Sequence, residues 1–301
     1  MRLSQTCCAT AFAIAVLAGS AAAQTPAHPA PEAAPRARML TRFEANSVQL
    51  RDVAAFVRVI PENRADVAVG FVNEGALRAP EYRVSRRRLI VDGKLRRQIR
   101  SCRVSGAEAF EVQTTRNGTL SGSELPVIEL RVPQNAVVAA SGAVRMHVAP
   151  AQSATIRLDG CGDADIVRVE NEAEIAVNGA QDVRLYEAGS ATIALAGAGD
   201  ITVGAVREGL TLSVAGAGDF DGARIDGATT IVIQGAGDVE IRDGRATNLS
   251  VAIYGGGDVT HNGSAQSLDA VILGGGDVHV RRVDGNVNRR VLGGGEVTVG
   301  R

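Results

Sequence analysis

One short pattern recurs through the second half of this chain: a hydrophobic residue, two alternate glycines and a carboxylate. It is written LAGAGD at Leu195, VAGAGD at Val214 and IQGAGD at Ile233. Successive copies are 18 to 20 residues apart, a period typical of proteins built from stacked coils. A repeat of this length buries its apolar face only against its neighbours. The acidic position recurs eight times, at Asp163, Asp182, Asp200, Asp219, Asp238, Asp258, Asp277 and Glu296.

Apolar and polar residues alternate within each repeat, which indicates β-strands. Leu249, Val251 and Ile253 share one parity, and turn dipeptides such as Asp226-Gly227 fall between the acidic positions. No proline occurs between residues 151 and 301, as expected where every backbone N–H joins a ladder. The sequence therefore predicts an all-β fold. We expect a parallel β-helix or β-solenoid with about 19 residues per coil, preceded by irregular β coils.

The N-terminus predicts export. A basic start and the apolar run 11–18 lead to three alanines before Gln24, which is the layout of a secretory signal peptide. The run is too short to span a bilayer, so we expect no transmembrane segment in the mature chain. We expect the periplasm, the cell envelope or the extracellular space as its location. The predicted parts are a signal peptide (1–23), a Pro/Ala-rich linker (24–40), an N-terminal β region continuous with the solenoid (41–150) and the solenoid repeats with G-x-G-D corners (151–301).

The glycines of the repeat are predicted to be structural. At two alternate positions they either remove side chains where the walls of a thin coil approach, or supply a positive φ at a corner. A phosphate-cradling role is disfavoured because no helical pattern follows any copy. The predicted corner glycines are Gly197, Gly199, Gly216, Gly218, Gly235, Gly237, Gly255, Gly257, Gly274, Gly276, Gly293 and Gly295.

The stacked acids need compensation, because carboxylates about 4.8 Å apart repel by about 1 kcal/mol per neighbour in water. In one interpretation each acid accepts backbone N–H groups one or two residues further on, as in an Asx turn. In the other, Ca²⁺ ions lie between successive coils, about 2.4 Å from each oxygen. No second acidic column completes a coordination sphere, so we favour the turn and expect no cofactor. A calcium ladder along the acids remains the alternative.

Carboxylates about 5 Å apart also resemble the catalytic pair of a retaining glycosidase. Here every adjacent pair would qualify, and the repeats contain only Tyr186, Phe220 and Tyr254 as aromatic residues that could select one. No serine or cysteine has a recognisable nucleophile setting, and we expect His261 and His279 on solvated strand faces. The sequence therefore predicts no catalytic residue, and a protein that is not an enzyme.

Outside the repeats, basic residues gather between Tyr82 and Arg103, with Asp92 as the single acid. This cluster fits either an anion-binding patch or a solvated loop and strand face. The formal net charge of -1 gives no reason to expect a nucleic-acid partner. Cys102 and Cys161 either form a disulfide in an oxidising compartment or pack separately as small apolar residues. The candidate anion patch consists of Arg86, Arg87, Arg88, Arg96 and Arg97.

The chain resembles the putative auto-transporter adhesin family, the head GIN domain, of bacterial exported proteins. The likeness rests on the GAGD and GGGD strings and on the segment 127–130 that leads into Ser141-Gly142. It extends from about Phe43 to Arg301. The resemblance implies a β-helical fold and surface adhesion, and it supplies no catalytic or ligand residues. The pattern departs from the family's at Asn178-Gly179-Ala180-Gln181 and at Ala143, which we assign to the acidic position of a ninth, decayed copy.

These features favour a non-enzymatic, exported β-solenoid whose stacked faces form a rigid, adhesin-like surface at the cell envelope. Its partner would be an envelope polysaccharide or another surface protein. The alternatives are a β-helix enzyme that acts on polysaccharide and a calcium-stabilised structural rod.

Overall fold

The computed structural model describes residues 39–105 and 109–300, and these residues are almost entirely β-structure. The predicted signal peptide, and the predicted linker up to residue 38, lie outside the described residues. The described part of the chain has no α-helix, and therefore no helix that could cross a membrane. Its one helical turn is the 3₁₀ turn η1 (Gly122–Glu124).

The strands divide into the stacked coils, a group at their N-terminal end and a small separate sheet. The coil strands are β2 (Ser47–Glu62), β10 (Asn135–Val148), β11 (Ser153–Ile166), β12 (Val169–Leu195), β13 (Ile201–Val214), β14 (Phe220–Ile225), β15 (Gly227–Ile233), β16 (Val239–Ile241), β17 (Arg245–Ile253), β18 (Val259–Ala265), β19 (Leu268–Ile272), β20 (Val278–Val283), β21 (Val287–Val291) and β22 (Val297–Val299). The N-terminal group is β1 (Leu40–Phe43), β3 (Val67–Asn73), β4 (Glu81–Ser85), β5 (Arg88–Asp92) and β9 (Val127–Pro133). The small sheet is β6 (Ile99–Ser105), β7 (Ala109–Thr114) and β8 (Gly118–Ser121).

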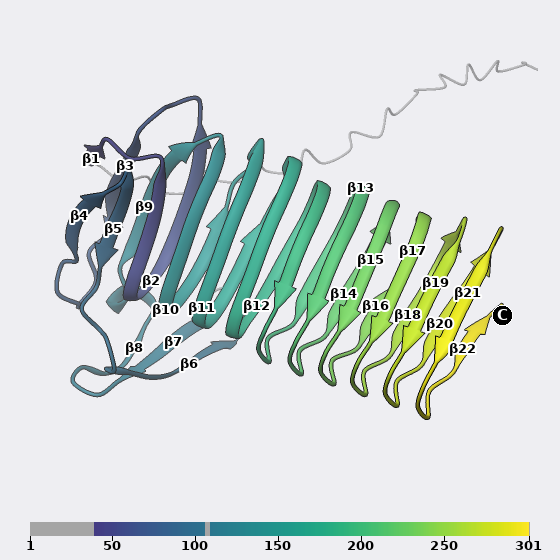
Figure 1. Cartoon of the computed structure of the whole chain (residues 1–301). Coiled ribbons are helices and arrows are strands. Elements are labelled where there is room, and N and C mark those ends of the chain that lie inside the picture. The colour runs from purple at the N-terminus through teal and green to yellow at the C-terminus, as the bar shows by residue number, and fades with distance from the viewer. Residues whose placement is uncertain (1–38, 106–108, 301) are drawn as a thin grey trace, which may run out of the picture. The chain divides into compact units, whose positions relative to one another are not determined.

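The coil strands stack in parallel, so that each residue lies beside the residue one repeat further along the chain (Figure 1). Asp163 pairs with Asp182, and Phe220 pairs with Val239, both at a shift of 19 residues. The predicted parallel β-solenoid and its coil length are therefore confirmed. A slip of one residue would turn the apolar side chains of a strand outward, so the alternation in the sequence fixes this register.

Alternate side chains of every coil fill one continuous core. In β17, Leu249, Val251 and Ile253 are at most 1% exposed. They lie beside Leu268, Ala270 and Ile272 of β19, which are at most 2% exposed. Burying one such side chain contributes about 1.5–3 kcal/mol. Because each coil covers the apolar side chains of its neighbour, the core continues along the stack.

The N-terminal group covers one end of the stack (Figure 1). Strand β10 pairs in parallel with β2, and β2 pairs in parallel with β5 and β9. Strand β4 pairs with β5, β3 with β9 and β1 with β3, all antiparallel. The irregular β coils expected here are therefore parallel coil strands with antiparallel strands added at the end.

The small antiparallel sheet lies against the side of the first coils. Phe110 and Val112 of β7 are fully buried and pack with Ala54 of β2 and Ala143 of β10 in a second apolar cluster. In Figure 1, β6 and β7 lie at the lower edge of the stack, the edge at which the later coils make their G-x-G-D bends. We call this edge the glycine edge.

Two columns of glycines run along the glycine edge, and the contact between coils requires both. A Cβ on Gly235 would lie 1.9 Å from the carbonyl oxygen of Gly216, and one on Gly237 would lie 2.1 Å from that of Gly218. The conflict is with the backbone one coil earlier, not with the opposite wall of the same coil. Neither predicted reason, close walls or positive φ, therefore applies to these glycines. The predicted corner residues form a first column (Gly197, Gly216, Gly235, Gly255, Gly274, Gly293) and a second column (Gly199, Gly218, Gly237, Gly257, Gly276, Gly295).

Adjacent glycines of one repeat should differ sharply in their tolerance of alanine. A Cβ on Gly255 would lie 1.9 Å from the carbonyl oxygen of Gly235, whereas one on Gly256 meets no atom within 4 Å. We expect Gly255→Ala to lower the free energy of unfolding by about 3 kcal/mol or more, because the coils must separate. Gly256→Ala, the matched control, should be nearly neutral. Urea unfolding measures both variants, and equal losses would contradict the coil-contact explanation.

Candidate functional site

The repeated acids form an exposed column along the glycine edge. Oδ1 of Asp219 accepts a hydrogen bond from the backbone N–H of Asp238 at 2.8 Å, and Oδ1 of Asp238 accepts one from Asp258 at 2.9 Å. The same bond recurs in each step from Asp182 to Glu296, at 2.7–3.0 Å. The acids accept backbone N–H groups, as in the favoured interpretation. The donor, however, is the acid of the next coil rather than a residue one or two places further on.

The backbone carbonyl of each acid is used in the same step. The N–H of Phe220 donates to the carbonyl of Asp238 at 2.8 Å, and the N–H of Val239 donates to that of Asp258 at 2.8 Å. A hydrogen bond to a charged group contributes about 1.5–3 kcal/mol. This exceeds the repulsion of about 1 kcal/mol between neighbouring charges in water. The acids can therefore stack on backbone donors alone.

The acidic column begins at a buried residue. Asp163 is 7% exposed, and this burial raises the pKa of its carboxyl. The nearby negative charge of Asp182 raises the pKa further, by a smaller amount. Arg145, in the preceding coil, opposes the rise. Arg145 pairs with Asp163, whereas Ala143 pairs with Cys161. The assignment of Ala143 to the acidic position of a ninth copy is therefore wrong, because the register is shifted by two residues and brings an arginine there.

The column has no geometry that distinguishes one acid as catalytic. Asp200, Asp219 and Asp238 are all exposed and make the same contacts one coil apart. Among the described residues, no group of three or more His, Cys, Asp or Glu is arranged to hold a metal ion. What the column offers to solvent is a regular row of negative charges.

His261 lies in the core, so the expected solvated position is wrong. It pairs with Ile241 in the coil before and Val280 in the coil after, and is fully buried. Neither ring nitrogen has a hydrogen-bond partner among the described residues, and burial lowers its pKa, opposed in part by Asp243. Its parity with the buried Val259 two residues earlier could have located it. His279 is half-buried, with Nδ1 3.0 Å from the hydroxyl of Thr298.

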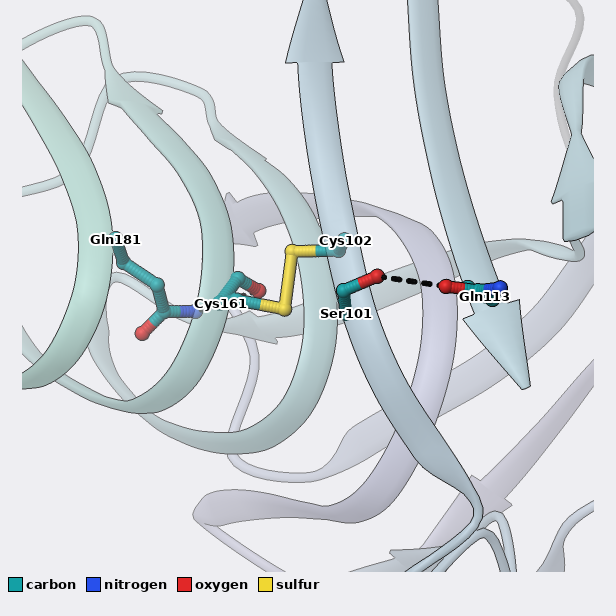
Figure 2. Close-up of a disulfide and its surroundings, with 5 residues drawn as sticks. All are labelled: Ser101, Cys102, Gln113, Cys161 and Gln181. Carbon is teal, nitrogen blue, oxygen red and sulfur yellow. Dashed lines mark hydrogen bonds between the residues drawn. A yellow bond between two sulfur atoms is a disulfide. The ribbon is translucent and has the colours of Figure 1, made fainter. Parts of the chain in front are cut away.

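A disulfide joins the small sheet to the glycine edge (Figure 2). It links Cys102 of β6 to Cys161 of β11, with their Cα atoms 6.2 Å apart. Cys161 stands between the two glycine columns, where Ala143 and Ala180 stand in the adjacent coils. Beside it, Gln181 replaces a glycine of the second column, and its Nε2 donates to the carbonyl of Cys161 at 3.3 Å. Cys161 belongs to a coil on which the small sheet packs, and Gln181 belongs to the next coil.

The arginines of the candidate anion patch lie at the two ends of β5. Arg86 and Arg87 form the turn between β4 and β5, and Arg88 begins β5. Arg96 and Arg97 follow its other end. A five-residue strand spans about 17 Å. The structure therefore brings Arg86, Arg87 and Arg88 together and sets Arg96 and Arg97 apart from them.

The turn that carries Arg86 and Arg87 is conformationally strained. Their φ angles are 50° and 60°, as the two central residues of a type I′ hairpin require. Asn-Gly is the usual sequence there, because a left-handed conformation costs most residues with a Cβ about 1–2 kcal/mol. Both residues are exposed at the hairpin tip. The turn thus presents two adjacent guanidinium groups at a cost in stability.

Comparison with known proteins gives one family match and several similar solved structures. Residues 206–300 match the model of the family described as "Putative auto-transporter adhesin, head GIN domain", which confirms the resemblance over the later coils. No curated protein matches the chain. Similar solved structures include a putative adhesin from Bacteroides fragilis NCTC 9343, with 13% identity, 87% of this chain and 96% of that chain covered, and a TM-score of 0.41. A putative lipid binding protein from Parabacteroides distasonis ATCC 8503 has 13% identity, coverage of 87% and 96%, and a TM-score of 0.46. A putative adhesin from the same organism has 18% identity, coverage of 87% and 97%, and a TM-score of 0.34.

The coil-to-coil bond of the acids makes a specific prediction for Asp238. Asp238→Ala removes the acceptor of the Asp258 N–H, and we expect the free energy of unfolding to fall by about 1–2 kcal/mol. Asp238→Asn keeps an oxygen acceptor and should lose less. The control is Glu240→Ala, an exposed acid two residues away, which should stay within about 0.5 kcal/mol. If the Asn and Ala variants lose equal stability in urea unfolding, the bond is not what stabilises the corner.

Buried His261 should make stability depend on pH. Its folded-state pKa is lowered, so below the unfolded value of about 6.5 the unfolded chain binds a proton that the folded chain excludes. Stability is therefore full above about pH 6.5 and falls by up to about 1.4 kcal/mol per pH unit below it. His261→Ile, which copies Ile241 of the preceding coil, should remove this part of the slope. Thermal unfolding of both proteins from pH 7.5 to 5 is the measurement, and parallel curves would contradict the assignment.

Proposed function

We propose, from the match of residues 206–300 to an adhesin family, that this chain is a non-enzymatic, exported, adhesin-like protein that binds an anionic polymer of the cell envelope. The solenoid acts as a rigid support. Binding is carried by the exposed arginines at its N-terminal end, above all Arg86, Arg87 and Arg88.

One observation carries this proposal: the arginines between residues 83 and 103 differ in their partners from those between residues 157 and 242. Every arginine from Arg157 to Arg242 forms an ion pair, and those six are Arg157, Arg168, Arg184, Arg207, Arg224 and Arg242. By contrast, the eight arginines from Arg83 to Arg103 form no ion pair with the described residues. They are Arg83, Arg86, Arg87, Arg88, Arg96, Arg97, Arg100 and Arg103.

Uncompensated guanidinium groups that lie close together repel one another, and an anionic ligand would relieve that repulsion. Guanidinium also binds carboxylate, phosphate and sulfate groups through paired hydrogen bonds. The strained turn also supports a binding role, because Asn-Gly would be the more stable sequence at the positions of Arg86 and Arg87. A charged polymer that carries many such groups can contact exposed arginines at both ends of β5.

A groove on the same strands suits such a polymer. Arg51, Arg83 and Lys94 line an open groove of about 400 Å³ over β2, β4 and β5. Its two acids are held by Lys94, whose Nζ lies 2.9 Å from Glu81 and 3.6 Å from Asp92. Arg51 and Arg83 keep no acidic partner among the described residues and face the groove. The groove thus contains two arginines whose charges are not paired with a described acid.

The test is sedimentation of the full chain with isolated envelope fractions. We expect wild type to bind, and the triple variant Arg86→Asn, Arg87→Gly, Arg88→Ser to bind about tenfold more weakly, because three charges are lost. The matched control removes three exposed arginines of the later coils, Arg245→Ser, Arg281→Ser and Arg290→Ser, and should bind like wild type. About 0.5 M NaCl should release the wild-type protein, since screening weakens exposed charges.

Two outcomes would overturn the proposal: wild type that fails to sediment with any envelope fraction, or equal weakening by the two triple variants. Polysaccharide shortened during the incubation would instead favour an enzyme, and Asp219→Asn with Asp238→Asn would then have to abolish that activity.

A further inference from the structure

The small sheet covers the glycine edge only in its first coils. The position between the two glycine columns is Ala54, Ala143 and Cys161 in these coils, in register with one another. Ala54 and Ala143 are at most 1% exposed, and Cys161 is bonded to β6. In the later coils the same position is exposed throughout, at Ala180, Ala198, Ala217, Ala236, Gly256, Gly275 and Gly294. Within the described part of the chain, the edge therefore continues without a covering sheet beyond the small sheet that packs on its beginning (Figure 1).

The last three coils place large apolar side chains on this uncovered edge. Tyr254, Leu273 and Leu292 each precede the first glycine of their repeat and are 53%, 43% and 64% exposed. In earlier coils the same position holds small or polar residues, such as Ala215 and Gln234. Gly256 and Gly275 beside them have open space where a side chain would be. A flat backbone strip flanked by exposed apolar residues is the composition of a binding surface.

We propose that this surface, which we call the distal edge (Tyr254, Gly256, Leu273, Gly275, Leu292 and Gly294), binds a β-strand of a partner protein, as the first coils bind β6. The partner strand would carry apolar side chains interspersed with basic ones. It would run across successive coils, packing apolar side chains on the glycine strip and against the tyrosine and leucines. The inference concerns a different face and a different class of partner from the arginines, so it goes beyond the envelope-polymer proposal.

The chemistry of the partner follows from β6 and from the acids. The half-buried side chains of β6 that pack on the first coils are Ile99, Cys102 and Val104, and the exposed Arg100 and Arg103 lie among them in sequence. On the distal edge, Asp258 and Asp277 each stand two residues after the open glycine of their repeat, Gly256 and Gly275, and are exposed. A strand seated on the glycine strip would lie beside these carboxylates, so basic side chains would be favoured in it.

The same acids argue against a second copy of this chain as the occupant. If two copies packed their distal edges together across a two-fold axis, the acidic column of each copy would face either the acidic column or the apolar column of the other copy. The first arrangement brings like charges together, and the second places charged groups on apolar side chains without partners. A different protein with a basic, apolar strand avoids both costs.

The test is a cysteine-trapping experiment on the full chain, with a synthetic peptide of residues 99–121 as the probe. Cys102 of the peptide is activated as a thionitrobenzoate mixed disulfide. Gly275→Cys puts a thiol where Cys161 stands in its own coil, in space that is open. Thr211→Cys, an exposed residue on the outward face of β13, is the matched control.

If the distal edge accepts such a strand, the peptide should link to Gly275→Cys at least about tenfold faster than to Thr211→Cys, because binding raises its effective concentration. Adding Leu273→Ser and Leu292→Ser should abolish this advantage while leaving the control rate unchanged. A peptide with Ile99→Ser and Val104→Ser should also lose it. Equal rates for the two cysteines, or an advantage that survives the serine variants, would overturn the inference. Neither result bears on envelope binding by the arginines.

Discussion

The contact between the backbones of successive coils at the glycine edge is the constraint on which the rest of this structure depends. At Gly216, Gly235 and Gly255 the α-carbon of one coil sits so close to the carbonyl oxygen of the coil before that a Cβ would lie 1.9–2.0 Å from it. No rotamer or small shift removes such a conflict, since the obstructing atom is backbone. The coils can therefore stack at sheet spacing through this corner only if the repeat returns glycine to the same place every time.

The acid follows from the same constraint. At the corner the ladder of backbone bonds turns, and the N–H of each acid points along the stack toward the coil before. There Asp219 supplies the acceptor for Asp238, and Asp238 supplies it for Asp258. A carboxylate accepts more strongly than a neutral group, by enough to outweigh the repulsion from its neighbours. The repeated motif is thus one device, with glycine permitting the approach and the acid satisfying the donor that the approach exposes.

Much of the fold could be predicted because the same structural unit recurs in every coil, so its sequence pattern is repeated many times. The spacing from Asp200 to Asp219 gave the coil length, and the parity of Leu249 and Val251 gave the inward face. The reason for the glycines could not be obtained in this way, because the obstructing atom belongs to another coil. The register at Ala143 failed for a related reason, since a single weak copy does not show where its glycines align.

The candidate site was less predictable where the chain is not periodic. The pairing of Cys102 with Cys161 could not be predicted, because nothing in the sequence indicates that β6 returns to the edge of β11. The separation of Arg88 from Arg97 likewise depends on the length and direction of β5. His261 is different, because it shares the parity of the buried Val259, and this alternation predicts its position better than the general tendency of histidine to be solvated. In a solenoid, the alternation of apolar and polar residues predicts burial better than residue type does, because a shift of one residue would turn every apolar side chain of the strand to solvent.

Function in such a molecule should be sought where the repeat is broken rather than where it is kept. A residue that recurs in every coil, as the acid does, is explained by a requirement that every coil shares. The departures have no such explanation: the type I′ turn made of Arg86 and Arg87, the cysteine at position 161, and Leu273 and Leu292 where earlier coils have alanine or glutamine. Each departure costs stability, solubility or regularity, and Cys161 already shows what one of them achieves, because it attaches a second sheet to the glycine edge. The exposed leucines stand on the same edge with no covering sheet among the described residues, and an exposed apolar surface of that kind promotes aggregation unless a partner covers it.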